Sequence, residues 1–294
     1  MLDAGIEVPL VVTRPDRPSG RHSAPQASAV GRLAAERGIP AAKPQRLAGN
    51  EELFRQISDA RPDAGVVVAY GRLLPNALLE APPLGFVNVH ASLLPRHRGA
   101  SPVQAALLAG DVGTGVSTMR VVEDLDAGPV YLSRRVAIGQ REDAGSLSER
   151  LAAEGAELLV ETLRGLEAGT LLASPQAGTP SFCKPIRRQD GEVDWTLPAE
   201  TIERRLRAYT PWPGLYTFLG GERVKILAAR VGIPARDREP GDFWLEKDEL
   251  LAAAGGGTTL VLERVQREGR TASSGAEFAR GARPPGRFGR ASAG

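Results

Sequence analysis

The chain has 294 residues, 42% of them hydrophobic, a formal net charge of +2 and one cysteine. This length suits two domains, while Cys183 alone cannot form an internal disulfide and, with only three histidines, gives no basis for a zinc site. No apolar run is long enough to span a bilayer and the first residues do not form a secretory signal, so we expect a cytoplasmic protein with no membrane partner.

Short apolar runs alternate with helical patterns through roughly the first 170 residues, which predicts βαβ units. The fold class that we expect is α/β, with a Rossmann-like, mostly parallel sheet. Strands are predicted over residues 8–13, 64–69, 86–90 and 116–122. The first three are mainly apolar, as expected when both faces of a parallel sheet are covered.

Two helices are predicted in the same region. The first covers residues 26–37, where apolar residues recur at helical spacing, and ends before Gly38, a residue type that favours the left-handed conformation at helix ends. The second starts at Ser146, whose hydroxyl can cap it together with Glu149, and runs toward Glu167. We expect this second helix to pack on the sheet.

A change in composition predicts a domain boundary. Residues 172–186 are rich in Gly, Thr, Ser and Pro, and their prolines interrupt any regular element, so this segment is predicted to be a linker. It separates a first domain, residues 1–171, from a second domain, residues 187–294. The second domain is the more basic one, because its 18 basic and 15 acidic residues give +3, against −1 for residues 1–186.

The second domain has the pattern of a small β-barrel. A helix is predicted over residues 199–209, and strands over residues 215–219, 223–229 and 258–265 are separated by turn residues. Residues 281–294 consist mainly of Gly, Arg, Pro and Ala. Such a segment buries too little apolar surface to offset its ordering entropy, so we expect a disordered tail.

A candidate site lies at the end of a predicted strand. Residues 88–95 begin inside that strand and run off its C-terminal end, where open α/β sheets place their ligands. Asn88 and His90 are two positions apart and therefore project to the same side. An amide can hydrogen-bond a developing oxyanion and an imidazole handles protons near neutral pH, a pairing that suits acyl transfer. Asp126, on a later glycine-bearing loop, can orient His90.

Each of these residues also has a structural interpretation. A histidine at a strand end is more often a hydrogen-bonded structural residue than a catalytic one, and an asparagine beside it can serve turn formation. Asp126 followed by Ala127 and Gly128 also fits an ordinary turn. Spacing alone leaves both interpretations open.

The wider sequence around these residues resembles the active-site block of the folate-dependent formyltransferase family. The resemblance covers residues 88–95, 98–104 and 125–128, and the aspartate follows the histidine by 36 residues, in agreement with the family pattern. It implies 10-formyltetrahydrofolate as the co-substrate and a reaction without a metal. The catalytic residues that it implies are Asn88, His90 and Asp126.

The same resemblance implies that two segments contact the folate, largely through backbone groups that recognise its pterin. One segment follows the catalytic strand and the other is a loop over residues 70–74. The implied folate-binding residues are Ser92, Leu93, Leu94, Pro95, Gly71, Arg72, Leu73 and Leu74. Leucines are otherwise typical core residues, and that interpretation can hold for half of these four.

Further blocks indicate a family member that acts on transfer RNA. Residues 13–21 resemble a loop that such members insert beside the acceptor end of the tRNA. The implied tRNA contacts are Arg14, Arg17 and, most important, Arg21. Residues 191–195 and 207–214 resemble the start of an OB-like, tRNA-binding C-terminal domain. Taken alone, the loop fits a solvated connection, and the aromatic residues of the later blocks fit a core.

The sequence departs from the family pattern in two places. Residues 22–25 lack the glycine and basic residues that usually follow the loop, which predicts weaker contacts with phosphate. The family also begins with a strand, a turn and a helix, whereas this chain opens at what resembles the last turn of that helix. We therefore expect about twenty residues to be missing, which predicts unpaired neighbouring strands and a poorly soluble or weakly active chain.

The resemblance implies transfer of a formyl group from 10-formyltetrahydrofolate to the amino group of methionyl initiator tRNA, with no obligate protein partner. One alternative is a sugar-nucleotide N-formyltransferase, which shares the catalytic block but not the arginine-bearing loop. A hydrolase that releases formate is less favoured, because a second domain of tRNA-binding size would then lack a purpose. A third alternative is a non-catalytic remnant that binds folate or RNA.

Overall fold

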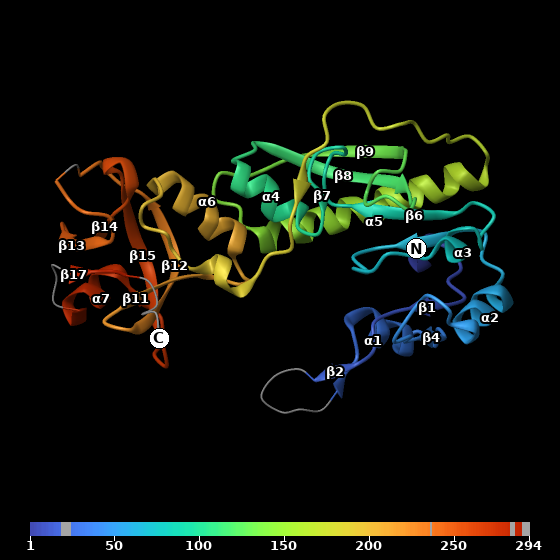
Figure 1. Cartoon of the computed structure of the whole chain (residues 1–294), viewed down its shortest axis with the longest axis horizontal. Helices are drawn as coiled ribbons and strands as arrows, with labels where there is room; N and C mark the ends of the chain where they lie inside the picture. The colour runs from blue at the N-terminus through green and yellow to red at the C-terminus, as the bar shows by residue number, and fades with distance from the viewer. Residues whose placement is uncertain (19–24, 236, 283–285, 290–294) are drawn as a thin grey trace. The chain divides into compact units, whose positions relative to one another are not determined.

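The computed structural model describes residues 1–18, 25–235, 237–282 and 286–289. The chain divides into two compact units, each assembled from several stretches of sequence (Figure 1). The first unit comprises Met1–Ala100, Gly115–Val136 and Leu151–Phe182, and the second comprises Ser101–Thr114, Ala137–Arg150 and Cys183–Gly294.

The first unit is built on a mixed sheet. Its strands follow the order β5 (Gly65–Val67), β6 (Phe86–His90), β8 (Gly113–Arg120) and β9 (Val130–Ala137). A separate parallel pair consists of β1 (Val11–Val12) and β4 (Ala41–Ala42). β5 and β6 are parallel, but β6 and β8 are antiparallel. The predicted α/β class is confirmed, and the sheet is mixed rather than mostly parallel because of β8.

Helix α5 (Ala144–Glu167) packs on one face of this sheet, as the sequence predicts (Figure 1). The contact is close at Gly155, where an added Cβ would lie 2.9 Å from Val89 Cγ1 and 3.3 Å from Val116 Cγ1. Because side chains alternate along a strand, the neighbours of Val89 in β6 project from the opposite face of the sheet.

The start of α5 differs from the prediction that Ser146 caps it. The helix begins at Ala144, which places Asp143 at the cap. The Asp143 carboxylate accepts the Ser146 backbone N–H at 2.9 Å, and the Ser146 hydroxyl accepts the Asp143 backbone N–H at 3.3 Å. Aspartate and serine both favour this position, and here the pair forms a reciprocal cap that begins three residues earlier.

Side-chain caps also begin two other helices of the first unit. α1 (Ala29–Glu36) follows Ser28, whose hydroxyl accepts the Gly31 N–H at 3.0 Å. α2 (Glu51–Ala60) follows Asn50, whose side-chain oxygen accepts the Leu53 N–H at 3.0 Å. The shorter elements of the two units are η1 (Leu2–Ala4), β2 (Arg17–Pro18), β3 (Pro25–Gln26), α3 (Asn76–Leu79), β7 (Arg98–Gly99), α4 (Pro102–Ala109), β10 (Phe182–Cys183), η2 (Arg188–Gly191) and η3 (Gly255–Gly257).

The second unit contains an antiparallel barrel that is nearly closed. Seven strands of the described chain form its sheet, in the order β11 (Leu215–Leu219), β12 (Glu222–Val231), β15 (Thr259–Arg267), β14 (Glu249–Ala253), β13 (Asp242–Glu246) and β17 (Gly286–Arg287), with β16 (Ser273–Ser274) beside β15. Phe218 and Gly289 exchange backbone hydrogen bonds of 3.2 and 2.8 Å, which link the two ends of the sheet. The helices of this unit include α4, α6 (Ala199–Tyr209) and α7 (Gly275–Ala282).

The prediction of a disordered tail from residue 281 onward is wrong for the residues described there. Residues 281–282 end α7, and β17 pairs with β13. Phe288 is 2% exposed, stacks on Trp195 with ring centroids 5.5 Å apart and lies 4.5 Å from the Phe243 centroid. Burial of the Phe288 ring in this aromatic core therefore offsets the entropy cost of ordering a segment whose composition predicts disorder.

Across the described residues, no helix combines the length and the apolar character needed to cross a membrane.

Candidate active site

Strand β6 carries the two polar side chains that the sequence singled out. Asn88 and His90 occupy alternate positions, so both project from the sheet face opposite α5. His90 is 5% exposed. Asn88 is partly exposed, and its carboxamide has no hydrogen-bond partner among the described residues. The structure therefore presents a fixed imidazole next to an amide that is available to a ligand.

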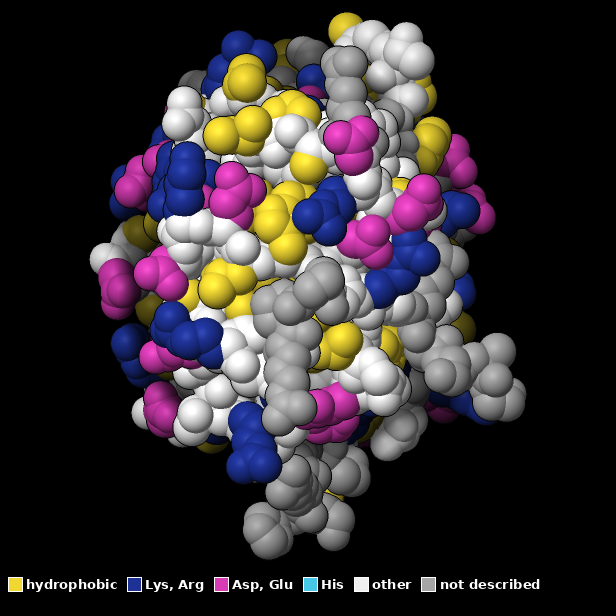
Figure 2. Space-filling view, turned by 90° about the vertical axis from the view of Figure 1, so that its left-hand side faces the viewer, with side chains coloured by type: hydrophobic (Ala, Val, Ile, Leu, Met, Phe, Trp, Pro, Cys, Tyr) yellow, Lys and Arg dark blue, Asp and Glu magenta, His cyan; other side chains and the backbone are white. Residues whose placement is uncertain are grey.

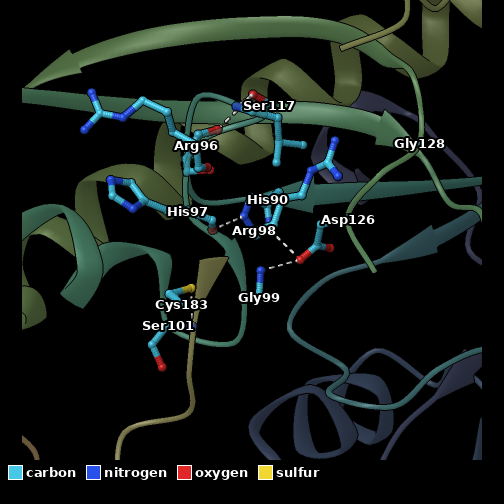
Figure 3. A network of polar contacts seen from close by, with 12 residues as sticks. His90, Arg96, His97, Arg98, Gly99, Ser101, Ser117, Asp126, Gly128 and Cys183 are labelled. Atoms are coloured by element: carbon cyan, nitrogen blue, oxygen red, sulfur yellow. Dashed lines mark hydrogen bonds and ion pairs between the residues drawn. The ribbon is translucent and has the colours of Figure 1, made fainter. Parts of the chain in front are cut away.

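The His90 ring lies between two acceptors (Figure 3). Its Nε2 is 3.0 Å from the carbonyl oxygen of His97, and its Nδ1 is 3.7 Å from Oδ2 of Asp126. A carbonyl oxygen can only accept, so Nε2 carries the hydrogen and Nδ1 is the nitrogen left for chemistry. The distance from Nδ1 to Asp126 exceeds that of a hydrogen bond, so a hydrogen on Nδ1 can be donated to a ligand while the carboxylate lies near the ring.

Asp126 is held in place by its backbone as well as by its carboxylate. Oδ2 accepts the Gly99 backbone N–H at 2.8 Å, and the residue adopts a left-handed conformation with φ of 50°. Nearby, a Cβ on Gly128 would lie 1.8 Å from the Arg120 carbonyl oxygen. Any side chain at position 128 would collide with the Arg120 carbonyl, so this position requires glycine. Asp126 thus lies in a tight loop and also close to His90.

The predicted folate segment after β6 is largely bonded within the protein. Ser92 is fully buried, and its hydroxyl donates to the Arg96 carbonyl at 2.6 Å. The Ser117 hydroxyl donates to the Ser92 carbonyl at 2.8 Å and accepts the Leu94 N–H at 3.3 Å. The carbonyls of Leu93 and Pro95 also accept backbone N–H groups. Few backbone groups of this segment are therefore left for a ligand.

The second predicted folate segment is more open. Leu73 is 70% exposed, whereas Leu74 packs against the core cluster around Leu53 and Leu78. Arg72 donates to the Pro44 and Gln45 carbonyls at 3.3 and 2.9 Å. The backbone groups of residues 71–74 form no hydrogen bond with another described residue. This loop can therefore offer N–H and carbonyl groups to a ligand, as the sequence resemblance implies.

The residues predicted to bind tRNA are only partly described. Arg14 and Arg17 are exposed, and Arg17 lies in a two-stranded hairpin formed by β2 and β3. Arg21 lies outside the described residues. In the second unit, Trp195 is buried and donates to the Thr217 hydroxyl at 3.0 Å, while Trp212 is 56% exposed. The core interpretation therefore holds for Trp195 and not for Trp212.

Sequence reasoning missed the side chains that hold the site together. Ser117 bridges two backbone groups after β6, and Gln176 contacts the Asp126 loop. Ser117 lies in the middle of a predicted strand and Gln176 in a segment with linker composition, so neither position carried a chemical motif. In the part of the chain that the structure describes, no group of three or more His, Cys, Asp or Glu residues is arranged to hold a metal ion.

Comparison with protein families places both parts of the chain. The model for "Formyl transferase" matches residues 3–163, and the model for "Formyl transferase, C-terminal domain" matches residues 185–283. The first match covers the α/β region that carries Asn88, His90 and Asp126, and the second covers most of the barrel. The chain belongs to the formyl transferase family, whose members are formyl-transferring enzymes.

Curated relatives narrow this assignment. A protein of Koribacter versatilis named methionyl-tRNA formyltransferase is 43% identical over 282 residues, which cover 96% of this chain and 90% of the relative. One from Thermus thermophilus with the same name is 45% identical over 276 residues, which cover 94% of this chain and 88% of the relative.

Two solved structures have a similar fold at low sequence identity. HypX from Aquifex aeolicus, in complex with tetrahydrofolic acid, matches with a TM-score of 0.60 and 17% identity over 92% of this chain and 46% of HypX. An N-formyltransferase from Helicobacter canadensis, in complex with folinic acid and dTDP-3-aminofucose, matches with a TM-score of 0.59 and 12% identity over 89% of this chain and all of the other.

Proposed function

We propose that this protein transfers the formyl group of 10-formyltetrahydrofolate to the amino group of methionyl initiator tRNA. The observation that carries the proposal is the partly exposed Asn88, which lies on the same strand face as His90, whose Nδ1 is 3.7 Å from Asp126. The names of relatives that are 43% and 45% identical over nearly the whole chain support methionyl-tRNA as the acceptor.

The reaction requires one bond to form and one to break. The acceptor nitrogen attacks the formyl carbon, and the bond from that carbon to N10 of the folate breaks with its electron pair returning to N10. The proton lost by the amine ends on N10. Asn88 and protonated His90, through Nδ1, donate hydrogen bonds to the formyl oxygen as it becomes negative. Asp126 holds the ring and helps to receive the amine proton before that proton reaches N10.

The folate would lie against the loop over residues 71–74. Its backbone groups are available, and Leu73 is exposed, which suits contact with a planar pterin. Within the predicted segment after β6, Ser92 supports the fold through its bonded hydroxyl rather than by ligand contact. The available groups of the site thus fit a folate, and its role there is to supply the formyl group.

The acceptor would bind through the arginine-bearing loop. Figure 2 looks onto the barrel, where Lys/Arg and Asp/Glu side chains are interspersed on the visible face. In the barrel, Arg280 pairs with Asp248 at 3.4 Å and Arg287 with Asp242 at 3.0 Å. These paired charges attract phosphate less than unpaired ones do.

We therefore assign phosphate contacts to the loop, through Arg14, Arg17 and Arg21. Residues 1–171 would form the catalytic domain, residues 172–186 the linker and residues 187–294 the OB-like domain that supports the tRNA. Translation takes place in the cytoplasm, which is the compartment that this substrate implies.

Single alanine substitutions test the assignment of the site. Asn88→Ala, His90→Ala and Asp126→Ala should each lower kcat for formylation of methionyl-tRNA by roughly two to four orders of magnitude, because each removes a group that acts on the transition state. Tetrahydrofolate binding, measured by calorimetry, should change far less. Near-normal turnover in all three variants would remove these residues from the reaction.

A further inference from the structure

Gln176 links the two backbone segments that hold Asp126. Its side-chain Nε2 donates to the Asp126 carbonyl at 2.8 Å and to the Gly128 carbonyl at 2.7 Å. Its Oε1 accepts from Arg98, with distances of 3.1 Å to Nε and 2.6 Å to Nη2. The Gln176 side-chain amide therefore bonds the Asp126 loop through its nitrogen and Arg98 through its oxygen.

These contacts act on both ends of the hydrogen bond that fixes the Asp126 carboxylate. Gln176 binds the backbone of Asp126 directly, and it binds the side chain of Arg98, the residue before Gly99. Gly99 donates its N–H to Asp126 Oδ2 at 2.8 Å. One side chain thus sets the position of the acceptor and braces the strand that carries the donor.

The same stretch of chain also braces the carbonyl that faces His90. The Ser181 hydroxyl accepts the His97 N–H at 2.8 Å, and the Ser181 carbonyl accepts the Arg98 N–H at 2.8 Å. The His97 carbonyl, which receives His90 Nε2, lies in a residue with φ of 56°. Gln176 and Ser181, five residues apart, thus both contact residues 97–98.

We propose that Gln176 is a positioning residue that sets the Asp126 carboxylate against His90. The proposal rests on the proposed function, because it gives Asp126 a role in formyl transfer. Gln176 touches neither ring nitrogen of His90, so it acts only through the Asp126 loop and Arg98. A left-handed aspartate needs such support, because this backbone conformation is intrinsically unfavourable for a residue with a side chain.

Two substitutions separate the contacts of Gln176. Gln176→Ala removes all of them. Gln176→Glu keeps an acceptor for Arg98 but places an oxygen where two carbonyl oxygens now receive N–H groups. Each should lower kcat by roughly ten- to hundredfold, since a displacement of about 1 Å in a catalytic group has an effect of that size. KM for the folate and for methionyl-tRNA should change by less than about threefold.

Gln189→Ala is the matched control, because Gln189 is exposed and its side chain forms no hydrogen bond with another described residue. It should leave kcat unchanged. The discriminating step is to add Gln176→Ala to Asp126→Ala. If Gln176 acts through the carboxylate, the second change lowers the residual rate by less than about twofold. A structural role would lower the rate by the same factor in both backgrounds.

The outcomes separate this proposal from the proposed function. Full activity of Asp126→Ala would contradict the catalytic assignment itself. An inactive Asp126→Ala together with a fully active Gln176→Ala or Gln176→Glu would overturn only the positioning role. Equal losses from Gln176→Ala with and without the Asp126 carboxylate would also overturn it. A loss confined to the protein that retains Asp126 would support it.

Discussion

Gly128→Ala is the smallest change that should move the Asp126 loop. The added Cβ would lie 1.8 Å from the Arg120 carbonyl oxygen, whereas real Cβ contacts stay above 3.0 Å. The loop must therefore shift by at least about 1.2 Å, because the obstacle is backbone in a packed sheet and has little room to yield.

This displacement is large compared with the contacts that fix the site. The Gln176 bond to the Gly128 carbonyl is 2.7 Å long, and the Gly99 bond to Asp126 Oδ2 is 2.8 Å long. A shift of about 1 Å takes either one beyond hydrogen-bonding range. We expect kcat to fall by roughly a hundredfold. The overpacking should destabilise the fold by about 1–3 kcal/mol, which lowers Tm by about 2–10 °C.

The assay is the initial rate of methionyl-tRNA formylation, measured well below the melting temperature of the variant. Gly281→Ala is the matched control, because an added Cβ there meets nothing within 4 Å and the residue lies in α7. Alanine in a helix should be neutral or stabilising. A Gly128→Ala protein that melts lower but turns over at the wild-type rate would refute the link between this loop and catalysis.

Two further predictions concern the arginine-bearing loop and Tyr70. Arg14→Ala with Arg17→Ala should raise KM for tRNA and reduce the salt dependence of the rate, because phosphate contacts are screened by ions; an unchanged salt slope would contradict this. The Tyr70 hydroxyl is buried without a partner, and burial raises the pKa of this phenol. The free energy of unfolding should therefore fall as pH rises above about 10, because the phenol ionises more readily in the unfolded chain than in the folded one. Tyr70→Phe should reduce that alkaline loss in thermal melts and be neutral or stabilising by up to about 1 kcal/mol near pH 7; strong destabilisation at pH 7 would refute it.

Local sequence patterns predicted several elements closely. The strand over residues 86–90, the helix over residues 199–209 and the strand over residues 215–219 coincide with β6, α6 and β11. In α6 the buried residues recur at helical spacing, and β6 and β11 are short, mainly apolar runs bounded by turn residues, so local sequence indicates all three. The alternation of side chains along β6 places Asn88 and His90 on one face.

Contacts between distant residues account for what the sequence could not predict. Phe288 is ordered because Trp195 and Phe243 provide its core, and neither is near it in sequence. Gln176 lies 50 residues after Asp126 in a segment with the composition of a linker, yet its side chain donates a hydrogen bond to the Asp126 carbonyl. The closeness of His90 and Asp126 came from family resemblance, because spacing alone left their structural interpretations open.

The central claim is tested most directly by offering the purified protein two acceptors with 10-formyltetrahydrofolate as the donor. One is methionyl initiator tRNA and the other is a nucleotide-linked amino sugar. We predict a kcat/KM for the tRNA that exceeds that for the sugar by orders of magnitude, with N-formylmethionine recovered after deacylation. A folded protein that formylates the sugar more efficiently, or that formylates neither acceptor, would contradict the account.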